Sequence, residues 1–126
     1  HFVNSHFMHP DDLLDKDRGA ALGWEKLRAR LDEYMTWMNE SAPSLRNLTG
    51  SELAGAVQRY GALTVDKEIT DQEIRIHLGN FYDEAYLMVR INDGTPGQVT
   101  GGELTNVTGN LYLLHAQERE VVIERN

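Results

Sequence analysis

Two histidines and two aspartates fall within the short stretch of residues 5–12, Ser-His-Phe-Met-His-Pro-Asp-Asp. Imidazole and carboxylate groups bind divalent metals and transfer protons near neutral pH. His6 and His9 are three residues apart, so on a strand they point to opposite faces and share a metal only if the strand bends or ends between them. Asp11 and Asp12 fit catalysis, but two acids after a strand are also typical of a helix-capping loop. His9 is therefore either a candidate proton donor or a loop histidine held by hydrogen bonds.

The residue content excludes several kinds of active site. The 126 residues contain no cysteine, which rules out disulfides, thiolate nucleophiles and cysteine-based zinc sites. The sequence has no nucleophile elbow, phosphate-binding glycine loop or calcium-loop pattern. His77 and His115 lie in stretches with alternating apolar residues, and no acids stand near them at ligand spacing. We expect both to point outward or to pair across strands.

Three aromatic side chains, Trp37, Phe81 and Tyr82, are candidates for stacking on a sugar ring. Trp24 and Trp37 are 13 residues apart, about 220° around a helix, so they cannot share one face. At least one of them then lies outside the apolar stripe of its helix. Packing is the simpler explanation for all the aromatic candidates, and sugar contact is the alternative.

The formal net charge is −8, with 20 acidic and 12 basic side chains. Such a charge repels a phosphate backbone and an anionic membrane surface, so neither nucleic acid nor a membrane surface is an expected partner. A neutral or cationic polymer would meet no such repulsion. The chain has no apolar run long enough to span a membrane and no basic-then-apolar leader, so we expect neither a membrane span nor a signal peptide.

The elements that must position these residues begin with a predicted strand at residues 1–9, whose pairing partners we expect to lie outside this sequence. Residues 19–40 are predicted to form an amphipathic helix. Its apolar positions recur at three- and four-residue steps: Trp24, Leu27, Leu31, Tyr34, Met35 and Met38. A second, short helix is predicted over residues 49–61, because Thr49 and Glu52 have capping-box spacing.

After residue 61 the hydrophobic period changes from helical to two. The predicted strands are separated by glycine- and asparagine-rich turns and centre on residues 63–65, 74–78, 85–91, 111–114 and 121–123. No helix-length segment separates them, so they must pair antiparallel. The predicted fold class is α+β: an N-terminal strand and two helices, then an antiparallel β-sandwich or open barrel of five to six strands. The predicted parts are residues 1–61 and residues 62–126.

Several phrases of the chain resemble a known enzyme family. They are residues 5–12, then Arg18, Trp24 and Leu27, the Tyr-Met-Thr-Trp of residues 34–37, the Pro-Ser-Leu-Arg-Asn-Leu-Thr of residues 43–49, and the stretches 101–104 and 109–114. Together they resemble the C-terminal end of a NodB-like polysaccharide deacetylase. The likeness is greatest to the Pel-type deacetylases of biofilm exopolysaccharides, and it covers the last barrel strand and helix and the C-terminal β domain.

The resemblance implies that residues 1–61 complete a barrel whose other strands lie elsewhere in a parent hydrolase. It implies a periplasmic or extracellular protein that removes acetyl groups from an exported amino-sugar polysaccharide. His9 matches the family's general acid best, and His6 is the second choice. The family's metal ligands and general base lie on earlier strands, so the resemblance implies no cofactor in this chain and a divalent metal such as zinc in the parent. The chain alone is then expected to be inactive.

A second family shares the string of residues 9–12, His-Pro-Asp-Asp. It comprises zinc deacetylases that act on glucosamine in lipid-linked sugars and small thiols. In them the histidine and the second aspartate bind zinc and the first aspartate is the base. Here Leu13 stands where that family has glutamate, and no α/β alternation follows.

Two other functions remain open from sequence. One is a non-catalytic carbohydrate-binding or interaction module, which aromatic side chains exposed on one sheet face would favour. The other is a structural cap that shields the apolar surface of the parent barrel.

Overall fold

The computed structural model describes residues 9–126. Contacts divide the chain into two compact units, His1–Leu45 and Arg46–Asn126. The division falls well before residue 61, where the hydrophobic period changes, because the second helix groups with the strands. The predicted strand of residues 1–9 lies, apart from His9, outside the described residues, and so does His6.

The first unit contains a 3-10 helix, η1 (Pro10–Leu13), and the long helix α1 (Gly23–Ser41). The predicted helix is present but begins four residues later than expected, because residues 19–22 form a turn. No residue of α1 is buried. Trp24 is 50% exposed and Trp37 is 60% exposed, so neither tryptophan is a core residue.

The second unit begins with α2 (Gly50–Ala62), which follows the capping box predicted from sequence. The Thr49 N–H donates to Glu52 Oε2 at 2.7 Å, and the Glu52 N–H donates to the Thr49 hydroxyl oxygen at 3.4 Å. These bonds satisfy two N–H groups that a helix start would otherwise leave unpaired. At the other end, the Asn80 side chain donates to the carbonyl of Ala62 at 3.0 Å, which ties the helix to the β domain.

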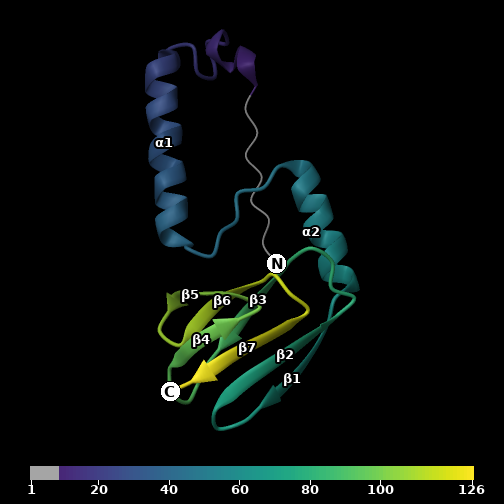
Figure 1. Ribbon diagram of the computed structural model, residues 1–126. Coiled ribbons are helices and arrows are strands. Elements are labelled where there is room, and N and C mark those ends of the chain that lie inside the picture. The colour runs from purple at the N-terminus through teal and green to yellow at the C-terminus, as the bar shows by residue number, and fades with distance from the viewer. Residues whose placement is uncertain (1–8) are drawn as a thin grey trace. The chain divides into compact units, whose positions relative to one another are not determined.

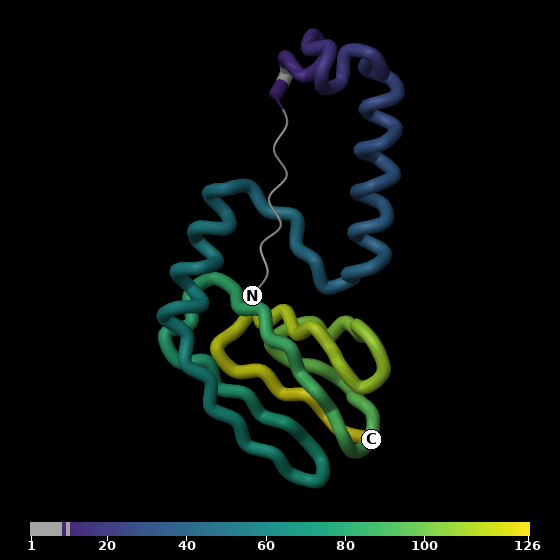
Figure 2. The backbone as a smooth tube through the Cα atoms, turned by 180° about the vertical axis from the view of Figure 1, so that it is seen from behind, coloured from purple at the N-terminus to yellow at the C-terminus, as the bar shows by residue number. Residues whose placement is uncertain are grey.

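Seven strands follow, and every hydrogen-bonded pair of strands is antiparallel. They are β1 (Thr64–Ile69), β2 (Glu73–Gly79), β3 (Ala85–Arg90), β4 (Pro96–Thr100), β5 (Gly102–Thr108), β6 (Leu111–Ala116) and β7 (Glu120–Arg125). One sheet has the order β1-β2-β7-β4 and the other the order β3-β6-β5. The two sheets pack together as a small sandwich (Figures 1 and 2). The predicted α+β class is therefore confirmed, with seven strands in place of five to six.

The two strands that the sequence pattern missed are β4 and β5. Their residues are rich in glycine, threonine and asparagine, which favour turns in a local reading. β4 forms a strand because it pairs with the distant β7, whereas β5 forms a hairpin with β6, the next strand along the chain. Gly101 joins them at φ +80°, where an added Cβ would lie 2.1 Å from the carbonyl oxygen of Glu120. Only glycine fits this connection without strain.

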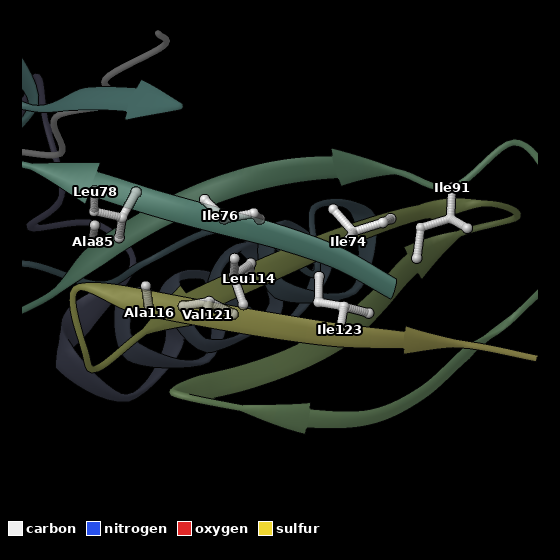
Figure 3. Packing of buried hydrophobic residues seen from close by; sticks show 9 residues of the cluster. All are labelled: Ile74, Ile76, Leu78, Ala85, Ile91, Leu114, Ala116, Val121 and Ile123. Carbon is white, nitrogen blue, oxygen red and sulfur yellow. The ribbon is translucent and has the colours of Figure 1, made fainter. Parts of the chain in front are cut away.

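The hydrophobic core lies between the two sheets (Figure 3). It consists of nine buried residues: Ile74, Ile76, Leu78, Ala85, Ile91, Leu114, Ala116, Val121 and Ile123. The alternation of β2 directs its three aliphatic side chains inward, as the period of two predicts. Each large aliphatic side chain contributes about 1.5–3 kcal/mol when fully buried. This core fixes the loops and strand ends of the second unit.

β1 is an edge strand with no buried residue. Its register with β2 places Val65, Lys67 and Ile69 on the same face as the buried isoleucines of β2. A charged lysine between two apolar residues on the inner face is a common protection against edge-to-edge association of sheets. We therefore do not regard this apolar strip as a binding surface.

Candidate functional site

His9 stands immediately before η1, in extended conformation with φ −87° and ψ 135°. Its side chain is 53% exposed, and its Nδ1 lies 3.7 Å from Asp11 Oδ1. The backbone N–H of His9 donates to Asp12 Oδ2 at 3.2 Å, and the backbone N–H of Asp12 donates to the carbonyl of His9 at 3.1 Å. The acids after His9 thus form the capping loop that was one of the two alternatives from sequence, while the imidazole remains at the surface.

Asp12 has a second partner in Arg18, whose Nη1 donates to Asp12 Oδ1 at 2.5 Å. This hydrogen bond is the largest cause that lowers the pKa of Asp12 below its ordinary value. Asp12 is therefore held ionised as a structural group that ties the capping loop to the following turn. A carboxylate so engaged is poorly suited to serve as a general base.

The aromatic candidates lie in different environments. Trp37, in the first unit, is largely exposed and lies beside Tyr34, with ring centroids 6.1 Å apart. Phe81 is partly buried and packs against the core of the second unit, as the packing alternative expected. Tyr82 is 75% exposed. Of the β domain's two aromatic candidates, Tyr82 is therefore the exposed one.

Sequence reasoning missed Glu84, which directly precedes β3 and contacts three other charged or titratable side chains. Glu84 Oε1 accepts a hydrogen bond from Arg46 Nη2 at 3.1 Å and from Arg59 Nη2 at 3.0 Å. Glu84 Oε2 lies 3.0 Å from His115 Nε2. All four side chains are between 23% and 28% exposed, so the cluster is largely shielded from solvent. It joins α2 and the segment before it to both β3 and β6.

Tyr86 lies between two members of this cluster. The β3–β6 register pairs Tyr86 with His115, and their rings stack with centroids 4.3 Å apart and planes 6° apart. The Arg46 guanidinium carbon lies 3.5 Å from the centroid of the Tyr86 ring, a cation–π distance. Burial, and then the charge of Glu84, raise the pKa of the Tyr86 phenol. Tyr86 therefore stays protonated and serves as a stacking platform.

A tight turn sets the position of Glu84. Asp83 adopts φ +67°, which is uncommon for a residue with a side chain. The backbone N–H of Glu84 donates to the carbonyl of Tyr82 at 2.8 Å, closing a three-residue turn around Asp83. The loop between β2 and β3 lies beside the C-terminal part of α2 (Figure 1). The turn thus directs Glu84 toward the arginines and leaves Asp83 exposed.

An open pocket of about 550 Å³ lies beside this cluster, within the second unit. Its polar lining consists of Arg46, Ser51, Glu52, Arg59, Asp83 and Glu84, and Leu48 and Gly55 add apolar surface. Three carboxylates outnumber two guanidinium groups, so the lining favours a polar ligand that is neutral or positively charged. The lining contains no histidine or cysteine.

His77 also has a carboxylate partner that its sequence neighbours do not reveal. Its Nδ1 is hydrogen-bonded to Glu120 Oε1. The two residues are direct partners in the β2–β7 register, and both side chains are about half exposed. His77 is therefore a strand-pair residue, as expected. Within residues 9–126, no three side chains of the metal-binding types come together.

One protein family matches the chain over most of its length. The matching family covers residues 1–113 and is described as an uncharacterised protein conserved in bacteria, DUF2194. The chain belongs to the DUF2194 family. No curated protein and no solved structure matches it. All the pocket-lining residues of this DUF2194 chain fall within the matched region.

None of the helices found in residues 9–126 combines the length and the apolar character needed to cross a bilayer.

Proposed function

We propose that this chain supplies the C-terminal portion of a metal-dependent polysaccharide N-deacetylase that acts on an exported amino-sugar polymer. In this proposal residues 1–61 complete the catalytic barrel and residues 62–126 form an accessory β domain. The proposal rests on the similarity of residues 5–12 and the later phrases to NodB-like and Pel-type deacetylases. The expected location, periplasmic or extracellular, follows from that similarity alone.

The observation that best supports the proposal is the exposure of His9. A general acid that serves a neighbouring catalytic centre must present its imidazole at a surface, and the His9 side chain is 53% exposed. A histidine enclosed in the packing of its own unit would have no access to a leaving group. The capping bonds of Asp12 to the backbone hold the loop at His9, and about half of the His9 side chain remains exposed.

His9 would act by donating a proton to the nitrogen of the amino sugar as its bond to the acetyl carbon breaks. A divalent metal such as zinc, expected in the parent barrel, would polarise the acetyl carbonyl when bound. The role left to this chain is proton donation at the leaving nitrogen.

The test uses the complete protein encoded by the gene and measures acetate release from an N-acetylated amino-sugar oligomer. His9→Asn should lower kcat by about 10²–10⁴-fold, the usual contribution of a general acid. His77→Asn is the matched control, because it makes the same chemical change at a half-exposed histidine of the β domain. Wild-type protein that releases no acetate with zinc present would refute the proposal, as would equal rates for the two variants.

The alternative is a non-catalytic carbohydrate-binding module, and the exposure of Tyr82 beside the pocket residue Asp83 favours it. Isothermal titration with soluble amino-sugar polymers, using Tyr82→Ala and Trp37→Ala, separates the two exposed aromatic candidates. A binding module should lose affinity with Tyr82→Ala. Absence of heat with every amino-sugar polymer would refute this alternative.

A further inference from the structure

We propose that the pocket beside Glu84 binds an amino sugar in its deacetylated form, with the protonated amino group held by Asp83. The choice of sugar rests on the proposed function, because a unit with a free amino group is the product of deacetylation. The position and charge of the site rest on the structure alone. The pocket's volume, about 550 Å³, lies within the usual range for small-ligand sites.

The three carboxylates of the pocket are not equally available to a ligand. Glu84 already accepts from both arginines and is paired with His115. Glu52 Oε2 accepts from the backbone and the hydroxyl of Thr49, and the backbone bond is the largest cause that lowers the pKa of Glu52. No hydrogen bond or ion pair within residues 9–126 engages the carboxylate of Asp83. Asp83 is therefore the acceptor that remains for an ammonium group.

The other lining groups suit the rest of a sugar ring. Arg46 and Arg59 each use one terminal nitrogen for Glu84, which leaves further N–H donors for hydroxyl groups of a ligand. The hydroxyl of Ser51 adds a donor and acceptor, and Leu48 offers apolar surface to the C–H face of a ring. A few directed polar groups beside an apolar surface are the usual composition of a small-ligand site.

The charge of the pocket separates cationic ligands from anionic ones. A carboxylated or phosphorylated sugar would meet three carboxylates, and the two guanidinium groups are already bonded to one of these. A neutral N-acetylated unit would lose the ion pair with Asp83. The structure therefore favours the free amino sugar over both.

The experiment titrates the 126-residue chain with a glucosamine tetramer and an N-acetylglucosamine tetramer, in 0.15 M salt at pH 6, by calorimetry and amide NMR. The variant is Asp83→Asn, because asparagine tolerates positive φ and preserves the turn. The matched control is Asp71→Asn, the same change at an exposed turn. Asp71 precedes β2 and Asp83 follows it. The seven residues of β2 span about 23 Å at the usual rise per residue of a strand, so the two substitutions lie at opposite ends of this strand.

We expect the glucosamine tetramer to bind at least 10-fold more tightly than the acetylated tetramer. Asp83→Asn should weaken its binding at least 10-fold, Asp71→Asn should leave it unchanged, and shifts should centre on the amides of Ser51 and Gly55. Equal loss in the two variants would reveal only diffuse attraction to a chain of net charge −8 and would overturn the proposal. Absence of binding, or equal affinity for both tetramers, would also overturn it. Acetate release by the complete protein is measured separately, so a failed pocket and a failed deacetylase are distinguishable.

Discussion

The Glu84 cluster makes a sharp prediction about stability. Glu84→Gln keeps the shape of the side chain but removes the charge that Arg46 and Arg59 share. The two guanidinium groups, 27% and 23% exposed, would then be close together without a compensating anion. His115 would lose its charged partner as well.

The expected loss lies between two limits. Breaking a buried ion pair by removing one partner costs about 3–5 kcal/mol, whereas exposed pairs contribute about 0–1 kcal/mol. Since each side chain of the cluster retains about a quarter of its exposure, we expect Glu84→Gln to cost about 2–3 kcal/mol. For a unit of about 80 residues, at about 4–8 °C per kcal/mol, Tm should fall by roughly 8–24 °C.

Thermal unfolding followed by circular dichroism of the β signal measures this change. Glu118→Gln is the matched control, because Glu118 is exposed and its side chain makes no hydrogen bond among the described residues. That control should stay within about 0.5 kcal/mol of the wild type. A Tm for Glu84→Gln that matches the Tm of Glu118→Gln would refute the conclusion that Glu84 holds the cluster together.

Two further predictions concern the core and the start of α2. Leu114→Ala should lower the free energy of unfolding by about 2–5 kcal/mol, because Leu114 is 0% exposed and the truncation leaves a cavity. Urea unfolding measures this loss. The control Leu14→Ala, at an 82% exposed position, should differ little from the wild type. The hydrogen bonds from Thr49 depress the pKa of Glu52, so the stability they add is present above the ordinary pKa of glutamate and is lost as the pH falls through the depressed value. Protection of the first α2 amides against hydrogen exchange should weaken over that acidic range. Glu52→Gln should remove this pH dependence. Protection that does not change with pH in the wild type would contradict the role of the capping box.

The sequence predicted the elements whose causes are local. Thr49 and Glu52 are three residues apart and act within one helical turn, so their pattern located the start of α2 correctly. The alternation of Ile74, Ile76 and Leu78 likewise predicted both the strand and its buried face. In these cases the residues that determine the structure are neighbours along the chain.

Much of what the sequence did not predict depends on distant partners. β4 has turn-forming residues and becomes a strand only through the distant β7. The partner of β5 is the next strand, β6, and β5 was missed because its glycine, threonine and asparagine residues favour turns. The Glu84 cluster joins residues 25, 31 and 38 positions away from Glu84, so no local spacing rule finds it. The turn that directs Glu84 is local, but the positive φ of Asp83 that forms it is visible only in the structure.

The central claim is that His9 donates a proton to the departing amino sugar, and the pH dependence of kcat in the complete protein tests it most directly. A general acid must be protonated to act, so wild-type kcat for acetate release should fall on the alkaline side of its profile. In His9→Asn the rate should be low throughout and that alkaline decline should disappear. A variant that retains both the wild-type rate and the wild-type alkaline limb would contradict the account.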